Sequence, residues 1–168
     1  TGWPHGTGVG LPQAPLTALR LDFGPDWSVG IVSNEPPLIG DPFVQLVPAV
    51  DKNGNDRAGI RLPEIVVPLA TQTGWNYRHP SIGAPDRLSS EIGSYFPFAL
   101  TRAEREENAD ARLSIAERYR DKNDYLGRIT IAALALIEQR YLLAVDLPAV
   151  IERATAHYDW AVAETTVR

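Results

Sequence analysis

The sequence predicts an α+β protein, with a small antiparallel sheet in its N-terminal part and a C-terminal helical hairpin. Pro and Gly lie before Leu100, except for Pro148 and Gly127, and these residues punctuate strands and turns rather than helices. Helix-capping residues and helical periodicity begin after Leu100. Strand-like and helix-like segments thus follow one another in blocks, which favours α+β over the alternation of an α/β protein.

The strand-like part contains four short apolar runs, at residues 19–23, 29–32, 43–47 and 58–62. Gly24-Pro25-Asp26 separates the first two as a turn. Asn53-Gly54 lies between the last two and tolerates the positive φ angles of a tight hairpin. We therefore expect 43–47 and 58–62 to form a hairpin.

The helical part contains two capping boxes, a hydroxyl followed three residues later by a carboxylate: Thr101 with Glu104 and Ser114 with Glu117. Each predicts a short helix, with the charged stretch 102–110 forming a solvated helix face. Residues 121–142 show helical periodicity on more than one side, which indicates a helix packed on several sides. Residues from 146 onward predict a second helix that folds back antiparallel.

Composition limits the classes of function. A length of 168 residues predicts one domain, here residues 21–168 as a single domain or C-terminal subdomain after an extended lead-in at 1–20. The net charge of −5 gives no electrostatic footprint for nucleic acid or an anionic membrane. No apolar run reaches the roughly 20 residues that span a bilayer. The absence of Cys excludes disulfides and assigns no compartment. The absence of Met, including at position 1, suggests a processed or truncated start at Thr1.

No complete catalytic machinery or cofactor motif is present. His5, His79 and His157 have no metal-ligand spacing, so no metal site is expected. A serine hydrolase needs a nucleophile elbow of the Gly-x-Ser-x-Gly type, and the nearest imitation, around Ser94, fits a structural turn better. Asp51-Lys52-Asn53-Gly54-Asn55 imitates a calcium loop but lacks its later Gly and Glu, so a hairpin turn explains it better.

Several stretches, weak singly, occur together in a fixed order: Leu21-Asp22-Phe23-Gly24-Pro25, Glu35-Pro36-Pro37, Leu46-Val47-Pro48-Ala49-Val50-Asp51-Lys52-Asn53-Gly54-Asn55, Ala58-Gly59-Ile60-Arg61-Leu62-Pro63-Glu64, Thr73-Gly74-Trp75-Asn76 with Arg78, Gly93-Ser94 with Pro97-Phe98, and Ser114 with Glu117-Arg118-Tyr119. As a set, over about residues 21–158, they resemble the C-terminal region of the alpha/beta hydrolase domain-containing family, bacterial serine-hydrolase-like proteins.

The resemblance implies that this chain is part of a larger α/β-hydrolase protein acting on ester-like substrates, with nucleophile and histidine upstream of Thr1. The chain would pack on that core and wall its cleft, without catalytic residues of its own and inactive when isolated. Its substrate-side candidates are Trp75, Asn76, Arg61, Arg78 and His79. For Trp75, anchoring of a buried loop is the competing interpretation. The alternative function is a stand-alone ligand-binding or structural module.

Aromatic residues in the loops predict an exposed interface. No amphipathic period explains Trp75, Tyr77, Tyr95, Phe96 and Phe98, and large apolar patches are uncommon on monomers. We therefore expect the isolated chain to self-associate through them.

Overall fold

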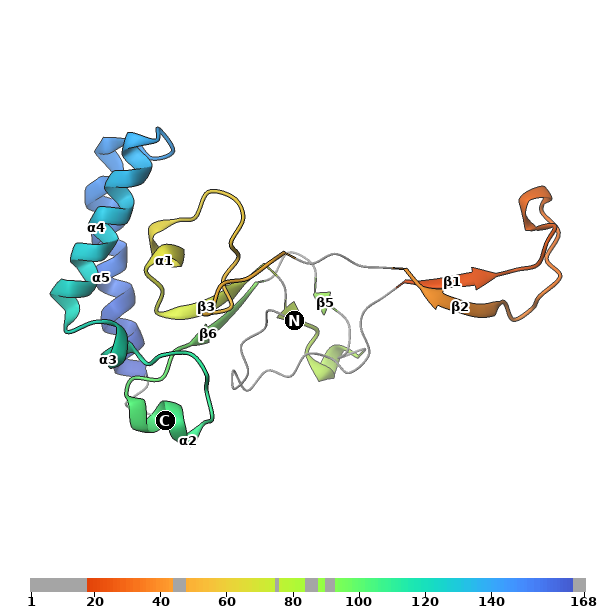
Figure 1. Cartoon of the computed structure of the whole chain (residues 1–168), viewed down its shortest axis with the longest axis horizontal. Helices are drawn as coiled ribbons and strands as arrows, with labels where there is room; N and C mark the ends of the chain where they lie inside the picture. Colours follow the sequence, from red (N-terminus) through yellow and green to blue (C-terminus); the bar gives the residue numbers. More distant parts are fainter. Residues whose placement is uncertain (1–17, 44–47, 75, 84–87, 90–92, 165–168) are drawn as a thin grey trace.

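The computed structural model of the chain describes residues 18–43, 48–74, 76–83, 88–89 and 93–164 (Figure 1). Their strands form three antiparallel pairs: β1 (Leu19–Asp22) with β2 (Leu38–Pro42), β3 (Ala70–Thr73) with β6 (Ser94–Pro97), and β4 (Asn76–Tyr77) with β5 (Leu88–Ser89). The α+β class is confirmed. The strands form separate pairs rather than one sheet, because each is only two to five residues long.

The helices are α1 (Pro63–Val66), α2 (Arg102–Glu107), α3 (Ile115–Arg118), α4 (Lys122–Glu138) and α5 (Leu147–Glu164), with 3₁₀ turns η1 (Trp27–Val29), η2 (Pro80–Ile82) and η3 (Ala144–Asp146). The long helices α4 and α5 lie side by side (Figure 1), which confirms the predicted helical hairpin. All described strands precede Leu100, and the one α-helix described before Leu100 is the single turn α1.

The first predicted strand forms as β1, but the second, at residues 29–32, does not form a strand. Residues 27–29 form η1, and Gly30 ends it with a φ of 86°, a conformation that suits Gly. The amides of Ser33 and Asn34 both donate to the carbonyl of Phe23. This closes a compact loop at the end of β1, so the strand that pairs with β1 is β2.

The predicted hairpin at Asn53-Gly54 is only partly right. The loop closes through an antiparallel bridge between Val50 and Asp56, and Gly54 has a φ of 82°. Residues 58–62 form no strand, because Gly59 turns the chain with a φ of 81° and Pro63 then starts α1. Of the other predicted strand, residues 44–47 lie outside the described residues.

Both predicted capping boxes start helices. At α3, the Ser114 hydroxyl accepts from the Glu117 amide while the Glu117 carboxylate accepts from the Ser114 amide. At α2, Thr101 accepts from the Glu104 amide, but the Glu104 carboxylate reaches past Thr101 to the amide of Leu100. Two free amides are satisfied at each helix start.

The core lies where the helical hairpin meets α1, α3 and the loop ends of β3 and β6. Its buried members are Val67, Leu69, Phe98, Ile115, Tyr119, Tyr125, Ile129, Ala133, Val150, Ala154 and Ala161. Within it, the Tyr119 hydroxyl donates to the Pro68 carbonyl at 2.8 Å, and burial raises the pKa of Tyr119 to about 12. This bond joins the helical part to the segment that leads into β3.

Two predictions about apolar residues need correction, one for α4 and one for Phe98. Ile131 is 69% exposed and Leu134 is 49% exposed, so the part of α4 that carries them is not packed. Phe98 is 1% exposed, while Tyr95 and Phe96 are partly buried. Phe98 is enclosed because it follows β6 directly into the core. Trp75 and the side chain of Tyr77 lie outside the description.

Two glycines give a matched test of the backbone. A Cβ at Gly93 would clash with the Thr73 carbonyl oxygen, whereas a Cβ at Gly127 would meet nothing within 4 Å. We expect Gly127→Ala to stabilise the protein by about 0.5–1 kcal/mol, because Gly is unfavourable inside a helix. Gly93→Ala should destabilise it by about 1–3 kcal/mol through overpacking. Urea unfolding of both variants checks this, and equal effects would contradict the described contact between Gly93 and β3.

Candidate functional site

The most completely built polar feature is the buried ion pair of Arg112 and Asp110, whose side chains are 3% and 6% exposed. All five N–H groups of the guanidinium are used. Nε and Nη2 donate to the Asp110 carboxylate, Nη1 donates to the Thr71 hydroxyl and the Phe96 carbonyl, and Nη2 also donates to the Pro97 carbonyl. These bonds are 2.6–3.2 Å long. A buried cation satisfied this completely holds β3, β6 and the chain after α2 together.

The network continues from Thr71 into the loop of residues 51–55. The buried Thr71 hydroxyl accepts from Arg112 and donates to the carbonyl of Asn53. Within the loop, one oxygen of Asp51 accepts from the amides of Asn53 and Asn55, at 2.8 and 3.2 Å. Asp51 therefore sets the shape of the turn, as Asp does in turns of this kind.

Asn55 is fully buried and acts as a strand partner for β3. Its Nδ2 donates to the Ala70 carbonyl at 3.1 Å, and its Oδ1 accepts from the Gln72 amide at 2.7 Å. These are backbone groups that a neighbouring strand would otherwise satisfy. One side-chain amide thus replaces a strand on that edge of β3.

Two guanidinium groups lie over the ring of Phe98. The carbon of the Arg118 guanidinium is 4.1 Å from the ring centroid and that of Arg112 is 5.0 Å away, within the range of cation–π attraction. Arg118 also donates to the Oδ1 of Asn53 at 2.8 Å. Burial lowers the pKa of Arg118. The Phe98 ring thus contacts both cations, of which Arg112 binds β3 and β6 and Arg118 binds the loop 51–55.

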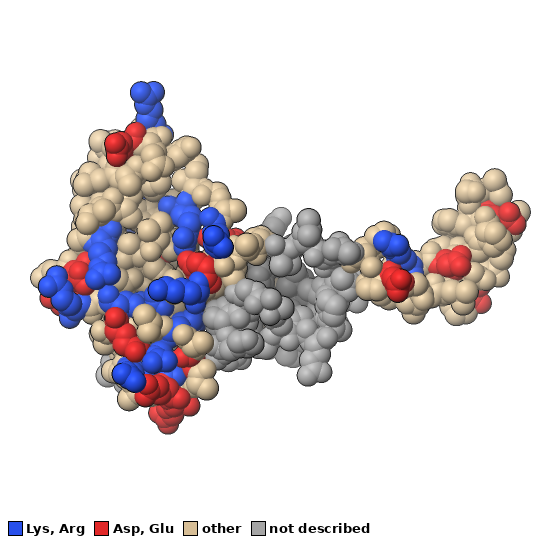
Figure 2. Space-filling model, in the orientation of Figure 1, with Lys and Arg blue, Asp and Glu red and all other residues tan. Residues whose placement is uncertain are grey.

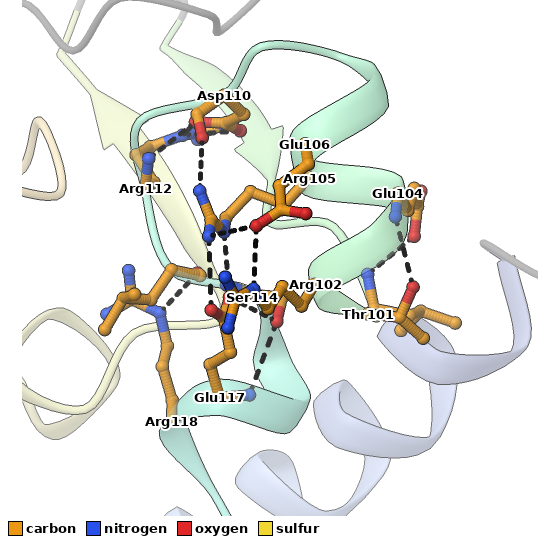
Figure 3. A network of polar contacts seen from close by, with 12 residues as sticks. Thr101, Arg102, Glu104, Arg105, Glu106, Asp110, Arg112, Ser114, Glu117 and Arg118 are labelled. Atoms are coloured by element: carbon orange, nitrogen blue, oxygen red, sulfur yellow. Dashed lines mark hydrogen bonds and ion pairs between the residues drawn. The ribbon is translucent and has the colours of Figure 1, made fainter.

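An outer layer of ion pairs covers the buried network (Figure 3). Arg105 of α2 donates to both oxygens of Glu117 in α3, at 2.9 and 3.2 Å. Arg105 and the Ser114 amide and hydroxyl together hold the pKa of Glu117 at about 2, so Glu117 stays ionised at any ordinary pH. The stretch 102–110 was predicted to be a solvated helix face; α2 itself is largely exposed, but Asp110 is buried as the counter-ion of Arg112.

Chemically, this network is a scaffold. The carboxylate oxygens of Asp51 and Asp110 already accept hydrogen bonds from guanidinium or backbone N–H groups. Both carboxylates are thus engaged in bonds that hold the fold. Within the described ranges, no group of three or more His, Cys, Asp or Glu side chains is placed to hold a metal ion.

The substrate-side candidates fall into two groups. Arg61 donates to Asp51 at 2.6 Å and to the Ile65 carbonyl, so it belongs to the base of the loop 51–55. Arg78 donates to the carbonyls of Ile82 and Gly83, and the exposed His79 bonds to the Ser81 hydroxyl at 2.7 Å. Asn76 is in β4 beside this turn, and Trp75 lies outside the described residues.

The third histidine pairs with a tyrosine. Nε2 of His157 in α5 is 2.7 Å from the hydroxyl of Tyr95 in β6, and the ring of Trp160 lies against Tyr95. Burial raises the pKa of Tyr95 to about 12 and lowers the pKa of His157. Ser94 is the first residue of β6 and not part of an elbow. Histidine here ties the strand pair to the helical hairpin.

The fold and the network define an α+β protein whose polar centre is structural. The family model described as "alpha/beta hydrolase domain" matches residues 3–152. The chain therefore belongs to the alpha/beta hydrolase domain family, and this membership suggests a hydrolase-like function. No curated protein and no solved structure matches the chain.

A separate finding concerns membranes. In the part of the chain that the structure describes, no helix combines the length and apolar character that crossing a bilayer requires.

Sequence reasoning missed the centre of the network. Asp110 and Arg112 stand two residues apart in a charged region, a pattern that usually indicates solvent exposure. The only signal was indirect: Asn53, Ser114 and Arg118 were among the residues that carried the family resemblance, and all three belong to the network or its edge. Residues that match a family pattern without a local structural reason can thus lie together in the fold.

Removal of network residues should cost far more than removal of surface charges. Arg112→Met leaves the Asp110 carboxylate buried without its cation, so we expect a loss of about 3–5 kcal/mol. Asn55→Ala leaves two β3 backbone groups unpaired and should cost about 1–3 kcal/mol. Urea unfolding followed by circular dichroism measures both.

Arg120→Met is the matched control, because the Arg120 side chain is 86% exposed and its ion pair with Asp124 is 3.8 Å long. That variant should change stability by less than about 0.5 kcal/mol. Similar losses for Arg112→Met and Arg120→Met would show that the buried pair does not hold the fold.

Proposed function

We propose that this chain is the accessory, C-terminal region of an alpha/beta-type hydrolase for ester-like substrates, packing on the catalytic core and walling its cleft. The observation that carries the proposal is the combination of family membership with a polar centre whose acidic groups are all engaged. Acyl transfer needs a nucleophile activated by a nearby base. Neither described histidine, His79 or His157, stands in a serine–histidine–carboxylate arrangement within the described residues.

The helical hairpin offers the surface for the core. Several large apolar side chains on α4 and the turn that follows it are exposed: Ile131, Leu134, Tyr141, Leu143 and Val145. Val145 is 79% exposed, and apolar residues gathered in this way mark interaction sites. A catalytic core packed on them would remove from water the side of α4 that the chain leaves uncovered.

The turn that follows β4 supports the substrate-side role of Asn76, Arg78 and His79. Arg78 donates hydrogen bonds to two carbonyls of its own turn and so fixes the turn. His79 is exposed and bonds to Ser81. Trp75 precedes this group in the sequence, and Arg61 braces the loop 51–55. In the proposal these residues line the cleft and leave bond breaking to the core.

The isolated chain should not hydrolyse esters. With short p-nitrophenyl esters as substrates, we expect release of nitrophenol at the rate seen with heat-denatured chain, because no activated nucleophile is available. Turnover that disappears in Ser94→Ala or in Ser81→Ala would contradict the proposal by placing the nucleophile in this chain.

The coding sequence supplies the complementary test. A Gly-x-Ser-x-Gly element in the same reading frame upstream of Thr1 is expected for a core that this chain serves. A start codon directly before Thr1 would contradict the accessory role and favour the stand-alone module.

A further inference from the structure

A second exposed apolar surface lies on the β1–β2 arm, residues 18–43. Figure 1 shows this arm extending away from the helices, and Figure 2 shows much of its surface as uncharged. Leu19, Leu21 and Ile39 are 46%, 49% and 70% exposed. Leu21 and Ile39 are direct partners in the strand pair, so they share one face of the arm.

Such an arm needs a covering surface. A two-stranded ribbon is marginally stable at best in water. Further strands would stabilise it, because three or more strands with an apolar face are needed for independent stability.

The two edges of the arm differ. β2 carries Gly40 and Pro42, and Pro lacks the N–H that would pair with another strand. β1 reads Leu19-Arg20-Leu21-Asp22, has no Pro or Gly, and all four residues are exposed. Its one strand neighbour among the described residues is β2. β1 is thus the edge open to a further strand.

We propose that β1 pairs with β1 of a second copy of this chain, antiparallel and with Leu21 on the two-fold axis. Charge complementarity selects this partner. Around Leu21, Arg20 of each copy stands opposite Asp22 of the other. Opposite charges facing each other across strands stabilise a pair, and the two-fold axis provides this contact twice.

The neighbouring registers are unfavourable. An axis at Arg20 sets two arginines against each other, and an axis at Asp22 does the same with two aspartates, so both place like charges directly opposite. An axis between Arg20 and Leu21 sets Arg20 against a leucine, and an axis between Leu21 and Asp22 sets Asp22 against a leucine. Both leave each charge without its counter-charge. The sequence of β1 therefore specifies one self-pairing register.

The resulting sheet has four strands in the order β2, β1, β1 and β2, with the two copies of β1 at its centre. Leu19, Leu21 and Ile39 of both copies form a continuous apolar face on it. This face is separate from the exposed face of α4, so the dimer does not depend on the proposed packing against a hydrolase core.

Charge exchange between copies tests the register. In Arg20→Glu, both contacts between position 20 of one copy and position 22 of the other set two carboxylates opposite each other. In Asp22→Lys, the same two contacts set two cations opposite each other. We expect each variant alone to dimerise at least about tenfold more weakly than the unchanged 168-residue chain. An equimolar mixture of the two variants restores opposite charges at both pairs, so a heterodimer should form with a dissociation constant within about threefold of the original dimer.

Sedimentation velocity over a concentration series measures the homodimers, and fluorescence anisotropy of one labelled variant titrated with the other measures the heterodimer. Asp41→Lys on β2 is the control and should leave dimerisation unchanged. Rescue by mixing reports the pairing of two copies, because a variant that failed to fold would not be rescued by the other. A wild-type chain that stays monomeric, or a dimer indifferent to all β1 substitutions, would overturn the proposal.

Discussion

The fold depends on the burial of one guanidinium. Arg112 can lie at 3% exposure only because the Asp110 carboxylate, the Thr71 hydroxyl and two β6 carbonyls accept from all of its N–H groups. Removing a charge from water is costly unless it is paired and hydrogen-bonded. This requirement fixes where β3, β6 and the segment before α3 lie relative to one another.

The loop 51–55 depends on the same cation. Thr71 passes the constraint on to the Asn53 carbonyl, and Asn55 replaces a strand along β3. Strands of two to five residues cannot build a core alone. Side chains in this protein supply the connections that a larger sheet would obtain from backbone pairing. A region of this kind suits a supporting role in a hydrolase, because its polar groups are already committed to structure.

Local signals could be predicted from the sequence, and contacts distant in the sequence could not. The caps at Thr101 and Ser114 and the helices α4 and α5 follow from spacing within a few residues. The strand predicted at residues 29–32 is wrong, because its strand composition gives way to loop hydrogen bonds from Ser33 and Asn34 to the Phe23 carbonyl. Burial of Phe98 and Asp110 depends on residues far away in the chain, which no local pattern reveals.

Native-state amide hydrogen exchange tests the central claim most directly. The amides to follow are three that donate to side chains of the network: Asn55 to Asp51, Gln72 to Asn55, and Arg112 to Asp110. If the buried cation unites these segments with the core, their free energies of opening should equal that of Ile129 in α4, within about 1 kcal/mol. Opening of the Asn55 and Gln72 amides several kcal/mol more easily than Ile129 would contradict the account, because the loop and β3 would then unfold without the helices.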